Sequence, residues 1–589
     1  MKHFVPLIFL LCLLFSACKP AERPPRDVIP PPKDADVFMG EPGQYGHIMV
    51  IADAIAPSTF NPLVAADLYS SVAIGHLMGA LIRVNPTTQE LLPGLAKSWE
   101  LAEDKKHYTF HLRQGLLWSD GAPFTADDVV FTFNALFDAR YPNRYKQQFI
   151  VDGKPLKVSK IDDYTVAFET GGLYAPFVYD LAGVEIIPKH KLETFYTDGR
   201  LLEQWTLKTA LTEPKEIVGM GAFRINTFRT GERIVYEPNP YYWRIDTDGK
   251  RLPYMNYLIY KFVPDANTML MLFSTGEVDA PASAIGPANI SWLEVAAKKY
   301  NFTLHARGPD SSIAFIWFNM KPGKDEKGDY YVNPEKLKWF TDKRFRQAIL
   351  YGTDREGMIR AQYLGKGQQL DSIISPANAK WYNPNTKKYR YDPLKAKMLF
   401  KEMGFWYNTD GKLRDRDGNP IEIEFLITEG RGQAPFLTIF QENMKELGID
   451  LKITFLDFST LLARTESFEY EATSIGFTGG GDPSGGKAIY KSDGAFHLWN
   501  PDQVKPETEW EARIDELFRK QEREFDEQKR IAIFYEIQEI ISEELPLIFL
   551  NIPITFIGIQ NRWKNVSISP MSPPLWNLDE VWTDVKDDD

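Results

Sequence analysis

The glycine-rich stretch from 475 to 486, IGFTGGGDPSGG, is the segment whose residue types most directly suggest chemistry. Glycines allow backbone N–H groups to approach a ligand closely, and Phe477 adds an apolar surface. The overlapping sequence GDPSGGKA nearly fits the phosphate loop G-x-x-x-x-G-K-[ST]. It fails because Ala488 has no hydroxyl group for Mg²⁺, and because Pro483 lacks a backbone donor that a phosphate cradle uses. We therefore interpret this stretch as a ligand-binding loop and not as a nucleotide site.

The other polar residues form no arrangement that is typical of catalysis or metal binding. His107 and His111 share one face of a predicted strand, but no third ligand or nucleophile lies near them in the sequence. The motifs G-x-S-x-G and H-E-x-x-H do not occur. Residues 415–418, DRDG, weakly resemble a calcium loop but lack the EF-hand spacing, so they are interpreted as a turn. We expect a protein that is not an enzyme and that has no cofactor and no metal site.

Composition and charge exclude some classes of function. The chain has 589 residues, enough for three or four domains, and its hydrophobic content of 44% is typical of globular proteins. Its net charge is -12 and its pI is near 5.4, whereas nucleic-acid-binding proteins usually have a basic surface. Both cysteines, Cys12 and Cys18, lie at the amino terminus, so the remaining chain has no disulfide and no cysteine metal site. We expect no nucleic-acid partner.

The amino terminus has the pattern of a secretory signal. Phe4 to Phe15 is an apolar run that is too short to span a bilayer. The Ser-Ala-Cys sequence that ends at Cys18 resembles the cleavage site of bacterial lipoproteins; an ordinary secretory signal with a chance cysteine is the alternative. We expect residues 1–17 to be a lipoprotein signal peptide and Cys18 to carry lipid. The proline-rich residues 18–45 are then expected to be an extended tether, which places the protein outside the cytoplasm on a membrane anchor.

Residues 91–136 predict a compact unit of strands followed by a helix. Trp99 to Ala102 is a short apolar run, and 103–106 is a polar turn. From His107 to Arg113 apolar and polar residues alternate, which is the period of a half-buried strand. Residues 125–128, TADD, predict a capping box in which Asp replaces the usual Glu, at the start of a helix.

The same unit also carries a family resemblance. Its sequence PGLAKSWE…YTFHLRQGLLWSDGAPFTADDVVFTF resembles the signature region of family 5 extracellular solute-binding proteins, the oligopeptide and dipeptide receptors of ABC importers. Further similar blocks are GMGAFRIN…NPYYW at 219–243, PDANTMLMLFSTGEVD at 264–279, and the helical segments 340–360 and 391–405. In the segment 340–360 we expect surface or interlobe ion pairs that involve Arg344, Arg346, Asp354 and Arg355. The resemblance covers about residues 46 to 570.

The resemblance implies an α/β fold of the type II periplasmic-binding-protein class with three lobes. Lobe one is expected to combine residues 46–79, 181–279 and 546–589; lobe two would be 80–180 and lobe three 280–545. Two crossovers, near 280 and near 546, would form a hinge that closes the ligand cleft between lobes one and three.

The resemblance also implies the ligand-binding positions. In this family the loop after the first strand lines the cleft, and a later loop, which follows a strand ending in "GW" and contains "DP", touches the ligand. Gly476-Phe477 matches "GW" here and Asp482-Pro483 matches "DP". The implied ligand-binding residues are Ala56, Ser58, Tyr69, Ser283, Asn319, Phe477, Thr478, Gly479, Gly480 and Asp482. Tyr242 and Trp243 are expected to pack in the core.

One departure from the family pattern leaves the ligand open. Peptide-binding members carry an Asp after the "GW" that pairs with the amino terminus of the peptide, and the matching position here is near Gly480. An unpaired buried ammonium would cost about 3–5 kcal/mol. Either another acid substitutes, Asp482 being the nearest in sequence, or the ligand has no free amino terminus.

These patterns predict a monomeric receptor that captures oligopeptides and delivers them to ABC permease subunits in the membrane. An oligosaccharide is the second candidate ligand within the same family. An extracytoplasmic hydrolase is a different class of function, and it would need a nucleophile and a base in the cleft. A sensor receptor that feeds a signalling partner is a third possibility.

Overall fold

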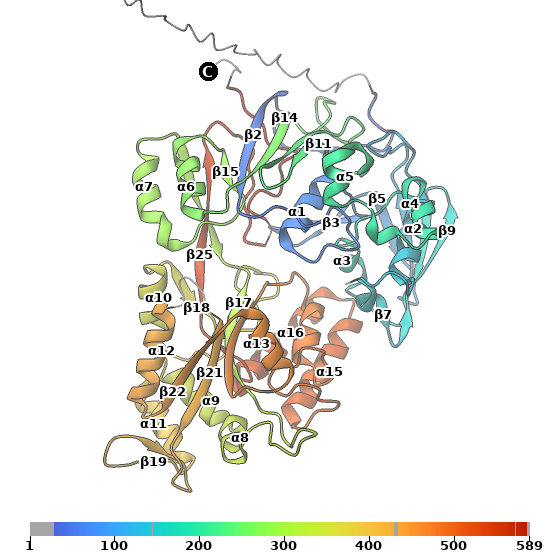
Figure 1. Ribbon diagram of the computed structural model, residues 1–589. Coiled ribbons are helices and arrows are strands. Elements are labelled where there is room, and N and C mark those ends of the chain that lie inside the picture. The colour runs from blue at the N-terminus through green and yellow to red at the C-terminus, as the bar shows by residue number, and fades with distance from the viewer. Residues whose placement is uncertain (1–28, 144, 429–433, 572, 586–589) are drawn as a thin grey trace, which may run out of the picture.

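The computed structural model describes residues 29–143, 145–428, 434–571 and 573–585. The predicted signal peptide and Cys18 lie outside these residues. Three lobes are visible, with lobes one and two side by side above lobe three (Figure 1). The predicted α/β class is confirmed, because helices cover mixed sheets in both halves of the molecule.

The sheet of lobe one has the strand order β11-β12-β14-β2-β15. Its central strand β2 is an apolar run whose Met49, Ile51 and Ala52 are completely buried. β2 is parallel to both β14 and β15, so the carboxyl ends of these three strands meet at one edge of the sheet. The strands are β2 (Gly46–Asp53), β11 (Phe223–Arg229), β12 (Arg233–Pro238), β14 (Met255–Phe262) and β15 (Ala280–Pro281), with helices α1 (Leu68–Leu77), α5 (Leu207–Thr212), α6 (Ala266–Thr275) and α7 (Ile290–Ala297).

Lobe two contains the unit that the sequence predicts most sharply. Thr125 and Asp128 form the predicted capping box at the start of α2 (Ala126–Phe137). In β6, Tyr108, Phe110 and Leu112 are buried, which confirms the predicted alternation. The lobe also contains β3 (Ile82–Val84), β4 (Leu91–Pro93), β5 (Ala96–Leu101), β6 (His107–Leu112), β7 (Ile150–Val151), β8 (Lys154–Pro155), β9 (Lys157–Asp162), β10 (Thr165–Glu169), α3 (Phe177–Leu181) and α4 (Lys189–Thr197). Its buried side chains belong to the same hydrophobic core as those of lobe one.

Lobe three is built on a sheet of order β22-β21-β23-β17-β24. β21 is parallel to β22 and β23, as the alternation of strands and helices predicts. β17 is antiparallel to β23, so Ile313 at its start lies opposite Phe477. The strands are β17 (Ile313–Phe318), β21 (Glu422–Thr428), β22 (Asp450–Leu456), β23 (Ala472–Phe477) and β24 (Ile548–Phe549), and the hairpin β19 (Trp406–Tyr407) and β20 (Leu413–Arg414) adds the predicted turns.

Several helices surround the sheet of lobe three. They are α8 (Pro334–Thr341), α9 (Lys343–Tyr351), α10 (Arg355–Tyr363), α11 (Pro393–Glu402), α12 (Ala434–Glu446), α13 (Phe458–Glu466), α14 (Lys487–Tyr490), α15 (Glu509–Arg523) and α16 (Glu527–Glu544). The segment 340–360, which resembles one helix, forms separate helices because Asp342 and Asp354 cap α9 and α10.

The expectation that the arginines of this segment form surface or interlobe ion pairs is wrong for two of them. Arg346 and Arg355 are among the largest fully buried side chains. Arg346 donates to the carbonyl oxygens of Phe340 and Glu544, and Arg355 pairs with Asp371 at 2.8 Å. Arg346 thus satisfies backbone carbonyl groups, and Arg355 satisfies a carboxylate together with the backbone carbonyl groups of Leu370 and Tyr389; helical spacing alone does not reveal these acceptors.

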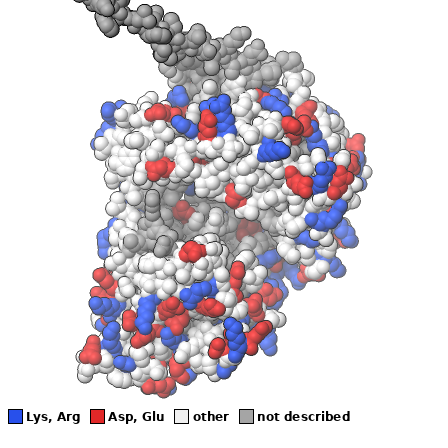
Figure 2. Space-filling model, viewed as in Figure 1, with Lys and Arg blue, Asp and Glu red and all other residues white. Residues whose placement is uncertain are grey.

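Two long antiparallel strands, β16 (Phe302–Pro309) and β25 (Asn551–Gln560), join lobe one to lobe three, with β18 (Gly367–Gln369) on the other side of β25. Side chains up to Phe302 pack with lobe one, and those from Ile313 pack with lobe three. The chain returns to lobe one between Ile552, which packs with lobe three, and Ile557, which packs with lobe one. Both crossings therefore come later than the predicted 280 and 546, because η4 (Pro287–Asn289) and α7 still pack on lobe one. Figure 2 shows a hollow between the upper lobes and lobe three.

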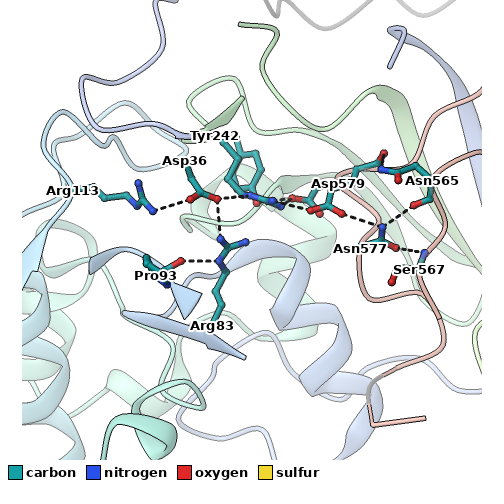
Figure 3. A network of polar contacts seen from close by, with 11 residues as sticks. Asp36, Arg83, Pro93, Arg113, Tyr242, Asn565, Ser567, Asn577 and Asp579 are labelled. Atoms are coloured by element: carbon teal, nitrogen blue, oxygen red, sulfur yellow. Dashed lines mark hydrogen bonds and ion pairs between the residues drawn. The ribbon is translucent and has the colours of Figure 1, made fainter. Parts of the chain in front are cut away.

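The prediction of a tether up to residue 45 is wrong for its second half. Residues 36–38 form strand β1 (Asp36–Phe38), which pairs with β13 (Arg244–Asp246). The carboxylate of Asp36 accepts hydrogen bonds from Arg83 at 2.8 Å, Arg113 at 2.9 Å and Arg244 at 3.0 Å (Figure 3). Burial opposes the ionisation of Asp36, but these arginines outweigh it and lower the pKa. Three cations thus dock the arm onto lobes one and two.

Candidate functional site

The candidate site is the cleft where the carboxyl edges of two sheets face each other. In lobe one the edge is formed by the ends of β14, β2 and β15. In lobe three it is formed by the ends of β21, β22 and β23. The strands β16 and β25 pair with each other and connect the two lobes, and β25 can be followed between them in Figure 1. Ligands of open α/β sheets bind at such carboxyl edges, so the topology itself indicates a binding site.

The upper wall of the cleft contains four of the predicted residues. Ala56 and Ser58 belong to the loop after β2, Tyr69 lies in the first turn of α1, and Ser283 follows β15. Ser58 and Ser283 are exposed, whereas Ala56 and Tyr69 are half-buried. The loop is held by Asp67, whose carboxylate accepts from the Ser58 hydroxyl at 2.7 Å and caps α1. The wall therefore presents a rigid loop with small polar groups.

The floor of the cleft is the glycine-rich loop after β23. Phe477 packs against Phe315 with ring centroids 5.7 Å apart, and Thr478 and Gly480 are exposed. A Cβ atom at Gly479 would lie 2.1 Å from the carbonyl oxygen of Ser311, so this position requires glycine. The loop backbone is held by the Asn378 side chain, which donates to the carbonyl oxygens of Gly480 at 3.0 Å and Gly481 at 3.1 Å. The sequence patterns did not identify Asn378, because it lies about a hundred residues before the loop.

Asp482 does not offer a free charge to the cleft. Its side chain is buried and pairs with Arg530 of α16 at 2.9 Å. The same carboxylate oxygen accepts from the backbone N–H of Ser484 at 3.0 Å and from its hydroxyl at 2.7 Å, and it caps η5 (Pro483–Gly486). The suggestion that Asp482 replaces the missing acid near Gly480 therefore finds no support in the geometry.

Asn319 is not in the cleft. It follows the carboxyl end of β17, whereas Phe477 pairs with Ile313 at the opposite end of that strand. Its side chain is fully buried and donates to the carbonyl oxygens of Phe468 at 3.0 Å and Tyr470 at 3.1 Å. The structure thus contradicts its assignment as a ligand-binding residue, because a polar residue that ends a buried strand here satisfies neighbouring backbone.

The expectation that Tyr242 and Trp243 pack in the core is confirmed. Both side chains are buried, and the Tyr242 hydroxyl donates to Asp579 at 2.9 Å. The preceding glycines also have a structural reason. A Cβ atom at Gly219 would lie 1.9 Å from the carbonyl oxygen of Leu77, so this glycine lets the chain pass the end of α1.

Lobes two and three touch beside the cleft. The backbone N–H of Ala175 donates to the carbonyl oxygen of Glu522 at 2.7 Å, and Arg523 pairs with Asp152 at 2.7 Å. A cavity of about 820 Å³ lies between these lobes and reaches Asp482. Within this contact, burial and the negative charge of Asp482 raise the pKa of Asp180 to about 7. The contact therefore contains a carboxyl group that titrates near neutral pH.

Outside the cleft, three acidic side chains bring their carboxylate oxygens close together. They are Glu335, Asp415 and Asp417. Asp415 accepts hydrogen bonds from the backbone N–H groups of Asp417 and Asn419 at 3.0 and 2.7 Å. Its second oxygen accepts from the Trp339 indole at 3.2 Å. These hydrogen bonds belong to the turn that the sequence predicts at residues 415–418.

In the residues that the structure covers, no helix combines the length and the apolar character needed to cross a bilayer.

Comparison with known proteins places the sequence among binding proteins. The family model described as "Bacterial extracellular solute-binding proteins, family 5 Middle" matches residues 90–495. A probable ABC transporter-binding protein of Deinococcus radiodurans is 28% identical over 517 residues, which cover 84% of each chain. The dipeptide-binding protein of Escherichia coli is 26% identical over 537 residues, covering 88% of this chain and 91% of that protein.

Solved structures share the fold. The oligopeptide-binding protein AppA of Bacillus subtilis, in complex with a nonapeptide, has a TM-score of 0.69 at 23% identity, covering 92% of this chain and 100% of its own. The periplasmic binding protein MelB of Agrobacterium fabrum, in complex with stachyose, has a TM-score of 0.69 at 22% identity, covering 93% and 86%. At this identity the likeness establishes the fold, which is that of type II periplasmic binding proteins.

Proposed function

The chain belongs to the bacterial extracellular solute-binding proteins of family 5, and from this membership we propose that it captures oligopeptides in the cleft between lobes one and three. In this proposal the closed, loaded protein delivers its ligand to the permease of an ABC importer. Ala56, Ser58, Tyr69 and Ser283 form the upper side of the site, and Phe477 to Gly480 form its floor. Asn319 and Asp482 are not included, because their side chains are engaged elsewhere.

The observation that carries this proposal is the position of the glycine loop at the end of β23. The loop backbone is exposed at Gly480, and a hydrogen bond from the Asn378 side chain to the Gly480 carbonyl oxygen fixes its position. An extended peptide can be bound through its main chain by such exposed backbone groups, which permits varied side chains. The long strands β16 and β25 are two chain crossings beside the cleft, and such crossings are suited to hinge closure.

Mass spectrometry of the purified native protein tests the ligand class directly. We expect co-purified peptides, and we expect added peptides to displace them. Small-angle scattering should show a smaller radius of gyration with peptide than without it. If only oligosaccharides are recovered and no peptide binds, the peptide proposal is wrong.

An oligosaccharide is the second candidate, and one specific observation favours it. The floor has no acid in place of the loop Asp of peptide-binding members, and Asp482 is paired with Arg530. Neutral hydrogen bonds and aromatic surfaces suffice for sugars, and the related MelB structure contains stachyose. Calorimetry with tetrasaccharides and with peptides of similar size separates the two ligands.

We further propose that lipid on Cys18 anchors the protein to the membrane, and that the protein is a monomer. The support is the lipoprotein-like sequence around Cys18. The docked arm from residue 29 leaves only a short chain between Cys18 and the folded body. In cells, the Cys18→Ser variant should lose its partition into membranes; if it remains membrane-bound like wild type, the anchor is assigned wrongly.

A further inference from the structure

The upper wall of the cleft contains an acid whose charge is not compensated. Asp53 is the last residue of β2, and its side chain lies in a small cavity beside Ile55 and Tyr69. We propose that Asp53 and the tyrosines around it receive the primary ammonium group of the ligand. This inference rests on the proposed function and narrows the ligand to a peptide with a free amino group.

Asp53 differs from an ordinary surface acid in its burial and its partners. It is 7% exposed and accepts a hydrogen bond from the backbone N–H of Ala54 at 2.7 Å. Across the described residues, no lysine, arginine or histidine balances its charge. Burial raises the pKa of Asp53, against the effect of backbone hydrogen bonds from Ala54 and Ile55. A buried carboxylate of this kind gains from any cation that reaches it.

The cavity next to Asp53 matches one ammonium group in size. Its volume is about 10 Å³, which is the space that one water-sized group needs. Tyr69, Tyr236 and Tyr260 line it together with Asp53. Aromatic faces attract a cation through the ring quadrupole. One acid and three tyrosines around a water-sized space therefore favour a compact, positively charged group.

The other titratable groups near the cavity do not supply this charge. His76 lines the same cavity, and its Nε2 shares a hydrogen bond with the Tyr260 hydroxyl at 3.0 Å. Burial lowers the pKa of His76 to about 4, so its ring is neutral at neutral pH. Asp67 is engaged with the hydroxyl groups of Ser58 and Ser70, both at 2.7 Å. Neither group therefore places a positive charge beside Asp53 at neutral pH.

The two walls complement each other in this arrangement. The floor holds the peptide backbone but has no free acid, because Gly480 occupies the usual position and Asp482 is paired with Arg530. Asp53 on the opposite wall is then the partner for the amino terminus. The peptide would lie with its amino end towards lobe one, and a neutral sugar would leave Asp53 unpaired.

Isothermal titration calorimetry at pH 7 with trialanine, tetra-alanine and penta-alanine tests this assignment, each with a free and with an acetylated amino terminus. We expect wild type to bind the free forms about tenfold more tightly or better. Asp53→Asn should weaken binding of the free forms by a similar factor and change that of the acetylated forms less than about twofold. Tyr69→Leu should weaken the free forms about threefold. The exposed Asp248→Asn variant, distant from the cleft in lobe one, should behave as wild type.

The outcomes separate this inference from the proposed function. If Asp53→Asn, with an unchanged melting temperature, binds both forms like wild type, Asp53 is not the ammonium partner although the protein binds peptides. If wild type prefers the acetylated forms, the inference is also overturned. If wild type binds no peptide and binds oligosaccharides, the proposed function itself is wrong and this inference fails with it. If Asp53→Asn does not fold, the Tyr69→Leu result decides.

Discussion

Two aspartates on opposite walls of the cleft have opposite surroundings. Asp482 below is paired with Arg530 and hydrogen-bonded to Ser484, so its charge is used to build the glycine loop. Asp53 above has backbone partners only, so its charge is available. Both side chains are more than nine-tenths buried. The comparison shows that burial and residue type do not distinguish a structural acid from a binding acid; the partner does.

The largest expected effect comes from breaking the compensated pair in the floor. Arg530→Met should lower the free energy of unfolding by about 3–5 kcal/mol, because Asp482 would remain buried without a cation. Chemical denaturation followed by tryptophan fluorescence measures this change. The double variant Arg530→Met with Asp482→Asn should recover much of the loss.

Arg513→Met is the matched control for this prediction. Arg513 also lies in a helix of lobe three and pairs with Glu536, but it is more than a third exposed. Exposed pairs contribute about 0–1 kcal/mol, so this change should be small. Equal effects at Arg513 and Arg530 would contradict the distinction between the two environments.

A second test concerns the close contact of the floor loop. Gly479→Ala should lower stability by about 1–3 kcal/mol and weaken ligand binding, because the new Cβ would lie 2.1 Å from the Ser311 carbonyl oxygen. Gly480→Ala is the control for stability, since its Cβ would meet no atom closer than 3.8 Å. Thermal unfolding should separate the two variants, and equal losses of stability would show that the contact is relaxed in solution.

A third test extends the comparison to the contact between lobes two and three. There Tyr174 donates to Asp180 at 2.6 Å, and the charges of Asp482, Lys487 and Arg530 surround it. Burial raises the pKa of Asp180 from 3.8 to about 7. If opening the contact restores the ordinary pKa, closure takes up a proton between these values. The closed state is then favoured at low pH and loses this advantage as pH rises through about 7.

The measurable consequence is a pH-dependent affinity. Asp180 keeps some contact with solvent, which weakens the coupling that the full shift to about 7 would give, so we expect affinity to fall by roughly tenfold from pH 5 to pH 8. The ratio of wild-type to Asp180→Asn affinity isolates this group from Asp53 and from the ligand. A ratio that is constant or rises with pH would exclude the coupling.

The smallest expected effect is on the stability of the ligand-free protein after Asp53→Asn. Because burial raises the pKa of Asp53, its ionised form destabilises the folded state above the ordinary pKa. The variant should therefore equal wild type near pH 3 and be equally stable, or more stable by up to about 1 kcal/mol, near pH 8. Thermal unfolding at both pH values measures this. A large loss of stability would make Asp53 a structural acid like Asp482.

Much of the architecture could be predicted because it depends on neighbours in sequence. The capping box at Thr125, the alternation from His107 and the parallel strands of lobe three are confirmed. The docked arm could not be predicted, since three distant arginines hold Asp36. The burial of Arg346 and Arg355 was also missed, because their acceptors lie on other elements.

For the candidate site, the sequence identified the two loops that face each other but not the acid that is free. The loop after β2 and the glycine loop after β23 follow apolar strands, and that local pattern places them at carboxyl edges. Whether Asp482 or Asp53 carries an available charge depends on Arg530, which is 48 residues away, and on tyrosines from three elements. Charge compensation acts through space, so only the folded arrangement decides which aspartate meets the ligand.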